Sequence, residues 1–295
     1  MRDDANNINN KAQLHTCGEL TPEQSKYAAE HLNEILPGRD QVIEDVRQWL
    51  LSCDDINART DDFFIARFLR GCKYNVDKTK KKLRNYYVQR SLSPEWFANR
   101  DPFLPEIQEL LNLGVFLPLR KVDDQGRMVI VIRACIHNPV KHKQADVFKT
   151  SMMILDLAMR DHVTSSLYGL IVIHDMKGVH FGHALQMTPG VIKRLVHTWQ
   201  GYPNRLNSLD YVNAPTHVNV ILSVFKRFMS KKLGERMHVH PGDGKSLLQK
   251  LSPDLLPKEL GGNDSDYATL KSYWKQQVEE NKQWFVEDEN YKLKT

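Results

Sequence analysis

The sequence predicts an α/β protein in which a helical N-terminal domain precedes a domain built on a mostly parallel sheet. Up to about residue 98, apolar residues recur at helical spacing. Beyond that point, strand-like runs alternate with helical ones, which is typical of a parallel sheet with crossover helices. A length of 295 residues also suits two domains. The expected segments are a flexible leader at 1–20, a helical domain at 21–98, an α/β domain at 99–262 and a terminal helix at 263–295.

Capping residues mark the helix starts in the first domain. Thr21 is a candidate N-cap, with Pro22 at the first helical position. The run Thr60-Asp61-Asp62 precedes a second apolar helix, which Gly71 ends. Asp77 starts a basic helix. We therefore expect the helical domain to consist of several short, well-delimited helices.

Strand and helix signals alternate along the second domain. The first two strands flank the turn signal at 123–126. A short apolar run at 170–173 is typical of a buried strand. The expected strands are 115–119, 128–133, 170–173, 209–213 and 236–240, and the expected helices are 144–162, one opened by Thr188-Pro189, and 216–233.

Composition excludes several classes of protein. With 41% apolar and 26% charged residues the chain is typical of a globular protein, and no apolar run approaches the ~18 residues of a membrane span. We expect no signal peptide. The net charge of +5 is too mild to indicate nucleic-acid binding. Cys17, Cys53, Cys72 and Cys135 form no CxxC pair, so we expect free thiols in the reducing cytoplasm.

Candidate catalytic and metal-binding residues are few. The chain has no Walker loop, GxGxxG, GxSxG or HExxH motif. His238 and His240 share one face of a strand, but two ligands without a third favour a structural role over a metal site. Asp175, at the end of a buried strand, is a candidate general base or a carboxylate that caps a loop. We expect neither a catalytic residue, nor a metal, nor a cofactor.

A basic run follows Asp77. It is a candidate phosphate or nucleic-acid patch, but charge runs on helices usually form solvated faces, and regularly spaced aromatic residues are missing. The run comprises Lys78, Lys80, Lys81, Lys82 and Arg84.

The segment 216–236 combines an apolar helix with a basic end. Apolar residues occupy more than one side of the helix, and the stretch 217–236 contains five basic residues and one acidic residue. This pattern fits a lid that covers an apolar cavity and touches an anionic membrane. An ordinary helix buried between the sheet and its neighbours is the alternative.

An ordered series of motifs along residues 21–290 resembles the CRAL-TRIO lipid-transfer family, and in particular its tocopherol-binding, retinaldehyde-binding and clavesin members. The segment Phe68–Tyr74 resembles the family's RFLRARKF segment, and the last motif resembles its LPxEYGG ending. The motifs are Phe68–Tyr74, Asp146–Phe148, Ile173–Gly178, Thr188-Pro189, Asn213–Pro215, His238–His240 and Leu256–Gly262.

The resemblance implies a carrier that binds one hydrophobic lipid in an apolar cavity between the sheet and a mobile lid helix. At two wall positions the chain departs from tocopherol-binding members: His174 replaces an apolar aromatic residue, and Leu155 replaces a serine. By position in the motifs, the expected wall residues are Phe148, Ser151, Leu155, Leu170, Val172, His174, Phe181, Met187 and Leu195, and the expected lid residues are Ile221, Phe225 and Met229.

The resemblance also implies a phosphoinositide site. Arg205, Lys232 and Arg236 match three of four basic family positions, and Asn207 replaces the fourth, so we expect weaker or altered lipid selectivity. The expected partners are a hydrophobic lipid and a phosphoinositide-containing membrane, with the protein cytoplasmic and peripherally attached to endosomal or similar membranes.

Three functions remain open at this point. The first is lipid transfer at membranes by lid opening. The second is a phosphoinositide-binding trafficking adaptor of the clavesin type. The third is an enzyme that uses Asp175 or His174.

Overall fold

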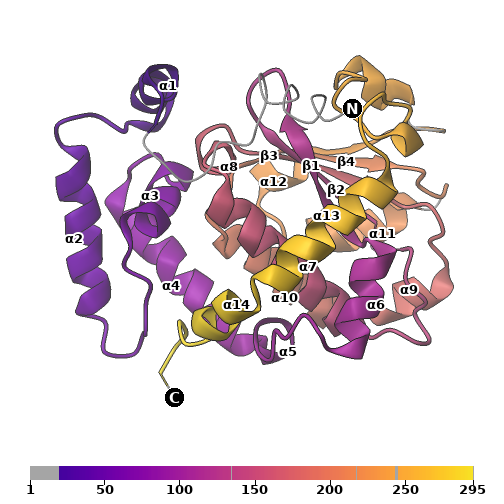
Figure 1. The fold of residues 1–295 in the computed structure, drawn as a ribbon, viewed down its shortest axis with the longest axis horizontal. Helices are drawn as coiled ribbons and strands as arrows, with labels where there is room; N and C mark the ends of the chain where they lie inside the picture. The colour runs from indigo at the N-terminus through magenta and orange to yellow at the C-terminus, as the bar shows by residue number, and fades with distance from the viewer. Residues whose placement is uncertain (1–19, 134, 217, 243–244, 295) are drawn as a thin grey trace, which may run out of the picture.

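Helices and a five-stranded sheet make up the described chain, which in this computed structural model comprises residues 20–133, 135–216, 218–242 and 245–294. The predicted leader lies outside these ranges except for Leu20. The first helices stand together at one side of the molecule, and α13, near the C-terminus, crosses in front of the sheet (Figure 1). The N-terminal helices are α1 (Pro22–Leu32), α2 (Arg39–Leu51), α3 (Asp62–Gly71), α4 (Val76–Leu92) and α5 (Pro94–Phe97).

Side-chain caps begin α1, α3 and α4 close to the predicted positions. The Thr21 hydroxyl accepts a hydrogen bond from the Gln24 N–H at 3.2 Å, and the Gln24 side chain accepts one from the Thr21 N–H at 3.0 Å. Asp61 accepts from the backbone N–H three residues later at 2.9 Å. The basic helix begins at Val76 and not at Asp77, because Asn75 is its N-cap.

The sheet is parallel apart from its first pair of strands, which confirms the predicted α/β architecture. Its order is β1-β2-β3-β4-β5. A tight turn joins β1 to β2, so these two strands are antiparallel, whereas the later strands are joined by helical crossovers and run parallel. The strands are β1 (Phe116–Val122), β2 (Met128–Ile132), β3 (Leu170–Asp175), β4 (Leu206–Val212) and β5 (Met237–Val239).

Alternate residues of β3 face opposite sides of the sheet. Ile171 and Ile173 are fully buried in the main apolar core. Val172 and His174, on the other side, line a large cavity. The remaining helices are α6 (Pro105–Leu113), α7 (Gln144–Asp161), α8 (Thr164–Leu167), α9 (Phe181–Gln186), α10 (Pro189–Gly201), α11 (Val218–Lys226), α12 (Lys231–Gly234), α13 (Tyr267–Glu280) and α14 (Lys282–Asp288), with 3-10 turns η1 (Lys245–Gln249) and η2 (Lys258–Leu260).

The segment predicted as one helix over 216–233 instead forms α11 and α12. The Ser230 hydroxyl accepts a hydrogen bond from the Leu233 N–H at 3.3 Å and so begins a new helix. Met229 therefore lies in the connection between the two helices and not on a continuous helical stripe. The predicted terminal helix likewise divides into α13 and α14, with Asn281 between them.

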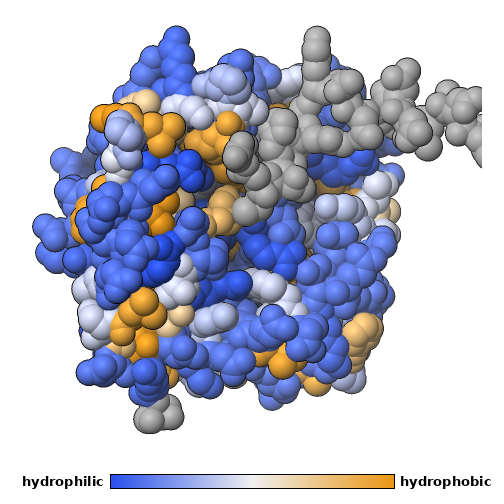
Figure 2. Space-filling model, turned by 60° about the vertical axis from the view of Figure 1, so that its left-hand side comes forward, coloured by the Kyte–Doolittle hydropathy of each residue, from blue (hydrophilic) through white to orange (hydrophobic). Residues whose placement is uncertain are grey.

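The surface on the side of the N-terminal helices is mainly hydrophilic. Figure 2 shows small apolar patches scattered within it. The exposed apolar residues of this part include Ile35, Leu36 and Leu51, each with about 60% of its surface accessible. Small apolar patches of this kind are common on protein surfaces.

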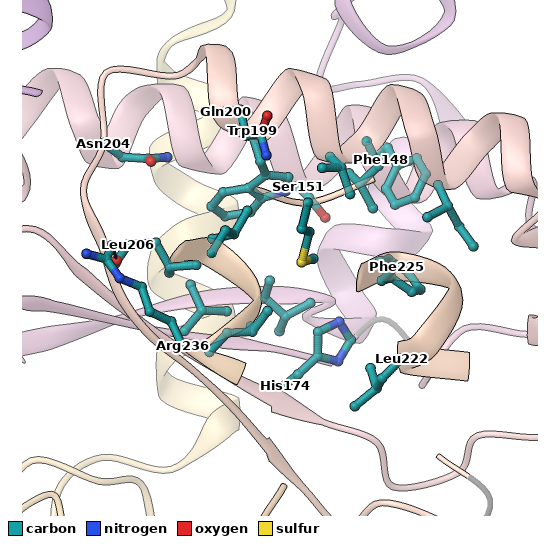
Figure 3. A pocket seen from close by; sticks show the side chains of 18 of the residues that line it. Phe148, Ser151, His174, Trp199, Gln200, Asn204, Leu206, Leu222, Phe225 and Arg236 are labelled. Atoms are coloured by element: carbon teal, nitrogen blue, oxygen red, sulfur yellow. Dashed lines mark hydrogen bonds between the residues drawn. The ribbon is translucent and has the colours of Figure 1, made fainter. Parts of the chain in front are cut away.

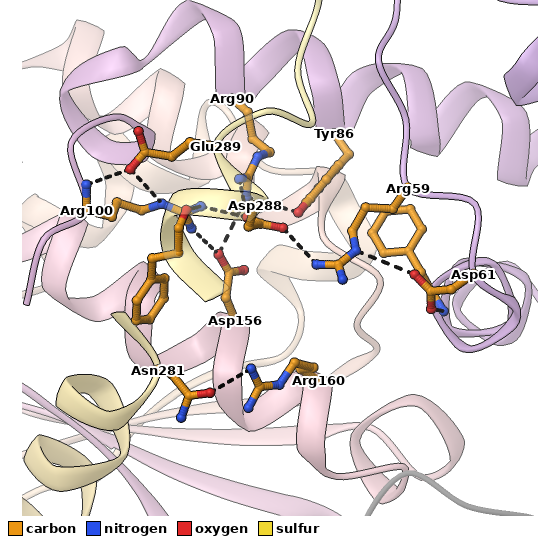
Figure 4. Close-up of polar contacts among 12 residues, drawn as sticks. Arg59, Asp61, Tyr86, Arg90, Arg100, Asp156, Arg160, Asn281, Asp288 and Glu289 are labelled. Atoms are coloured by element: carbon orange, nitrogen blue, oxygen red, sulfur yellow. Dashed lines mark hydrogen bonds and ion pairs between the residues drawn. The ribbon is translucent and has the colours of Figure 1, made fainter. Parts of the chain in front are cut away.

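A buried ion network joins the N-terminal helices to α7 and α14 (Figure 4). The Asp288 carboxylate accepts hydrogen bonds from Arg90 at 2.6 Å, Arg100 at 2.7 Å and Arg59 at 3.0 Å. Asp156, on α7, accepts a further bond from Arg100 at 2.9 Å. Arg90, Arg100, Asp156 and Asp288 are all buried. The network thus connects segments that lie far apart in the sequence.

The arginines keep Asp288 ionised. Burial alone would raise the pKa of this carboxyl, but the positive charges of Arg90, Arg100 and Arg59 outweigh burial and lower it. Because the folded-state pKa lies below the unfolded one, the stabilisation is present above the unfolded pKa of about 3.9 and is lost as the pH falls below it.

We expect Asp288→Ala to lower the free energy of unfolding by about 3–5 kcal/mol, because it leaves buried guanidinium groups without their counter-ion. Urea unfolding followed by circular dichroism measures the change. The matched control is Asp55→Ala, which removes the partner of Arg84 in a pair whose side chains are both about half exposed, and should cost about 0–1 kcal/mol. Equal losses in the two variants would contradict the structural role of the network.

Candidate functional site

A cavity of about 1270 Å³ lies between the sheet, α7, α10 and α11 (Figure 3). Strands β3 and β4 form its floor, α7 and α10 supply walls, and α11 covers it. Most of the lining side chains are apolar or aromatic, so the site suits a hydrophobic molecule. Representative lining residues are Met152 of α7, Ile192, Val196 and Trp199 of α10, and Leu206 and Leu209 of β4.

Seven of the nine expected wall residues line this cavity. Phe181 does so at the rim, where 75% of its surface is exposed. Leu155 and Leu170 do not line it; both have no accessible surface and are packed within the main core. Periodicity predicts which face of a helix or strand a residue occupies, but not how deeply its side chain is buried. Leu155 and Leu170 lie within the core and do not reach the cavity. The seven are Phe148, Ser151, Val172, His174, Phe181, Met187 and Leu195.

The segment expected to form the lid contributes several apolar side chains. Phe225 and Met229 line the cavity, and the side chain of Ile221 lies outside the described residues. Leu222 and Val224 also line it, although the sequence analysis does not single them out as site residues. Both lie within α11, before the break at its end, and their apolar character is visible in the sequence.

His174 and Tyr211 place polar groups among the apolar side chains of the floor. Their rings stack with centroids 5.3 Å apart and an angle of 14° between the planes. Burial lowers the pKa of His174 to about 4, against a small opposing effect of Asp175, so the imidazole is neutral near pH 7. The Ser151 hydroxyl donates to the Val147 carbonyl at 2.8 Å and is not a donor to His174.

The three expected phosphoinositide-binding residues are all among the lining residues of the cavity. Arg205, Lys232 and Arg236 all line it, as does Asn207. Arg205 donates to the Leu167 carbonyl at 3.1 Å. Burial, and then the nearby charge of Arg205, lowers the pKa of Arg236. Two guanidinium groups held near each other favour an anionic partner.

Part of the basic run on α4 reaches the same region. Lys78 and Lys82 line the cavity, together with Lys73 at the end of α3. Lys82 donates to the Gln200 carbonyl at 2.6 Å, and its burial lowers the pKa of its ammonium group. The run is therefore not only a solvated face: it adds positive charge between the helical domain and the sheet domain.

Asp175 holds a loop together. Its carboxylate accepts hydrogen bonds from the Asn213 side chain at 2.8 Å, the Lys177 N–H at 3.0 Å and the Tyr267 hydroxyl at 3.4 Å. These contacts satisfy the carboxylate and fix the chain after β3. The geometry favours the loop-capping interpretation over a general base.

His240 belongs to a second polar cluster, outside the cavity. Its Nε2 lies 2.9 Å from Asp210 and its Nδ1 lies 2.7 Å from the Ser246 hydroxyl. This Ser–His–Asp order resembles a nucleophile with its base, but Lys250 also binds Asp210, at 2.7 Å, and no member of the cluster lines the cavity. The cluster ties β4 and β5 to η1, whereas His238 is exposed on β5.

Among the residues that the structure describes, no three His, Cys, Asp or Glu side chains are grouped as a metal site would need. Within the same residues, no helix combines the length and apolar character needed to cross a bilayer. Cys53, Cys72 and Cys135 are free, and Cys17 lies outside the described part of the chain.

Comparison with known proteins agrees with this geometry. The CRAL/TRIO domain model matches residues 113–262, and a Pinta-like UBA domain model matches residues 37–107. Clavesin-1 of Xenopus laevis is 29% identical over 255 residues, covering 86% of this chain and 76% of that protein. Human clavesin-2 is 28% identical over 250 residues, covering 84% and 76%.

A solved structure shares the fold. The crystal structure of Sfh5 matches with a TM-score of 0.52 at 15% identity, covering 92% of this chain and all of that one. The CRAL/TRIO domain model spans half of the chain and contains the sheet and most of the residues that line the cavity. The chain therefore belongs to the CRAL/TRIO family of lipid-binding and lipid-transfer proteins.

Proposed function

We propose that this protein carries one hydrophobic lipid in the cavity and transfers it at phosphoinositide-containing membranes. The observation that carries the proposal is the apolar cavity of about 1270 Å³ beneath α11. Protein interiors are close-packed and rarely contain voids larger than a water molecule. A cavity of this size and lining therefore calls for an apolar occupant of lipid size.

The chemistry of the cavity favours binding over catalysis. The Ser151 hydroxyl donates its hydrogen bond to a backbone carbonyl, and the Asp175 carboxylate accepts a hydrogen bond from the Asn213 side chain. A carrier needs only shape, apolar surface and a few orienting groups, and we propose no enzymatic activity.

The lid offers a route for exchange. Its inward side chains are apolar, while Lys226, Arg227, Lys231 and Lys232 are exposed. Basic side chains near an anionic surface each contribute about 1 kcal/mol of attraction. Binding of the lid to a membrane brings its apolar residues to the lipid boundary, where α11 and α12 exchange contacts with the cavity for contacts with lipid. We place this step at the cytoplasmic face of endosomal or similar membranes.

The likeness to the clavesins favours a trafficking adaptor of the clavesin type as the second candidate. In that case the protein binds phosphoinositide surfaces and serves mainly to recruit partners. A carrier accelerates lipid movement between membranes, whereas an adaptor does not.

A vesicle assay tests the carrier function directly. Donor vesicles contain a fluorescent tocopherol as the hydrophobic probe, and acceptor vesicles contain phosphatidylinositol 4,5-bisphosphate. We expect catalytic amounts of the protein to raise the rate of probe transfer about tenfold or more above the spontaneous rate. Binding to the acceptor vesicles without any acceleration would favour the adaptor and contradict the carrier.

Phe225→Asp should abolish lipid retention, because it places a carboxylate against an apolar cavity without a partner. The lipid extracted per mole of purified protein measures retention. The matched control is Asn219→Asp, which introduces the same carboxylate at an exposed position of α11. Circular dichroism checks that both variants stay folded. Normal retention by the folded Phe225→Asp protein would rule out the lid assignment.

Membrane capture depends on the basic edge of the cavity. Replacing both Lys232 and Arg236 by Ala should weaken binding to phosphatidylinositol 4,5-bisphosphate liposomes about 30-fold, at about 1 kcal/mol for each charge. Liposome co-sedimentation measures the affinity. The control replaces both Lys26 and Lys294 by Ala. These substitutions change the net charge equally, and neither lysine lines the cavity. If the two double variants bind alike, the patch is not the capture site.

A further inference from the structure

A second, much smaller cavity lies where the N-terminal helices meet the rest of the molecule. Its volume is about 20 Å³, which is room for one body of the size of a water molecule. Its lining residues come from α3, α4, α7, α14 and the segments before α3 and after α10, and none of them lines the large cavity. Figure 4 shows four of them, Arg59, Tyr86, Asp156 and Asp288, within the ion network.

Arg67 of α3 brings a positive charge to this small cavity without a partner for it. The residue is 9% exposed, and within the described part of the chain its side chain makes no hydrogen bond and no ion pair. Its guanidinium only faces the rings of Phe63 and Phe64, at 5.2 and 5.4 Å. Burial lowers the pKa of Arg67, yet an arginine stays protonated in proteins. A buried charge without a counter-ion is strongly unfavourable.

The carboxylates nearby are bound to other arginines. Asp288 and Asp156 accept hydrogen bonds from the arginines of the ion network. Asp61 and Glu289, at the rim of the network, pair with one of these arginines each, at 3.5 and 3.9 Å. None of these carboxylates pairs with Arg67. The counter-ion of Arg67 is therefore not among the described residues.

Other groups around the small cavity also suit an anion. Arg59 adds a second guanidinium to its lining. The Tyr86 oxygen accepts a hydrogen bond from Arg90 at 3.0 Å, which leaves the phenol hydrogen available as a donor. Burial raises the pKa of Tyr86, so the phenol stays protonated. The two lining carboxylates, Asp156 and Asp288, already have their charges offset by the arginines that they bind.

We propose that this small cavity binds one monovalent inorganic anion, such as chloride, as the counter-ion of Arg67. A chloride ion is close to a water molecule in size, whereas a phosphate group is too large for about 20 Å³. The ion would sit between α3 and α4 on one side and α7 and α14 on the other, and so would hold the helical domain to the sheet domain. This site is independent of the lipid and of the residues expected to bind phosphoinositides.

Thermal unfolding of the full-length protein, followed by circular dichroism, tests the proposal. Sodium chloride replaces sodium gluconate at constant ionic strength, and gluconate is far too large for the small cavity. We expect the unfolding midpoint of the wild type to rise by about 2–4 °C and then to level off as the site fills, because an ion that binds only the folded protein stabilises it by mass action. Sodium bromide, which supplies a halide of similar size, should act like sodium chloride.

Arg67→Met removes the charge and keeps an apolar stem, so the midpoint of this variant should not depend on chloride. The matched control is Arg84→Met, the same substitution at a half-exposed side chain of α4 outside the small cavity, which should respond to chloride as the wild type does. If Arg67→Met does not fold, Arg67→Gln takes its place. A wild-type midpoint that does not change with chloride overturns the site, and so does an equal response in the folded Arg67 variant.

Discussion

Around a cavity of about 1270 Å³, side chains on opposite walls do not contact one another. The elements that surround the cavity, here called the frame, must therefore be held together by contacts away from it. The buried carboxylate of Asp288 meets this need. It binds guanidinium groups from the loop before α3, from α4 and from the segment after α5, while Asp156 brings α7 into the same network. The parallel pairing of β2, β3 and β4 holds the floor in the same way. The walls thus keep their shape without packing through the centre.

The lid is built differently from the frame. The helices α11 and α12 are short, and α11 rests on the floor through an apolar cluster that includes Val218 and Leu222. Apolar contacts have no strict geometry, so in the proposed transfer a lipid acyl or isoprenoid chain would replace them at little cost. Basic residues on the exposed side of the lid favour an anionic surface as the place for that replacement. A rigid frame under a cover held by apolar contacts would suit the reversible uptake that the proposed carrier function requires.

Local signals in the sequence predict much of this architecture. The caps at Thr21 and Asp61 mark helix starts, and the alternation of strands and helices predicts the mostly parallel sheet. Tertiary features are harder to predict. The apolar period continues through Met229, so periodicity does not predict that a new helix begins after Ser230. Periodicity also predicts the face on which Leu155 and Leu170 lie, but not how deeply their side chains are buried. The ion network joins Arg59 to Asp288, which lie far apart in the sequence, and no local sequence pattern predicts such a contact.

The most direct measurement of the central claim is the mass of the protein as purified from cells, recorded by native mass spectrometry before and after solvent extraction. The carrier account predicts a single discrete mass excess, equal to one apolar lipid per chain, that extraction removes while the chain stays folded. Extraction should recover the same lipid in equimolar amount. A chain that carries no excess mass, and that takes up no lipid when vesicles are offered, would contradict the account.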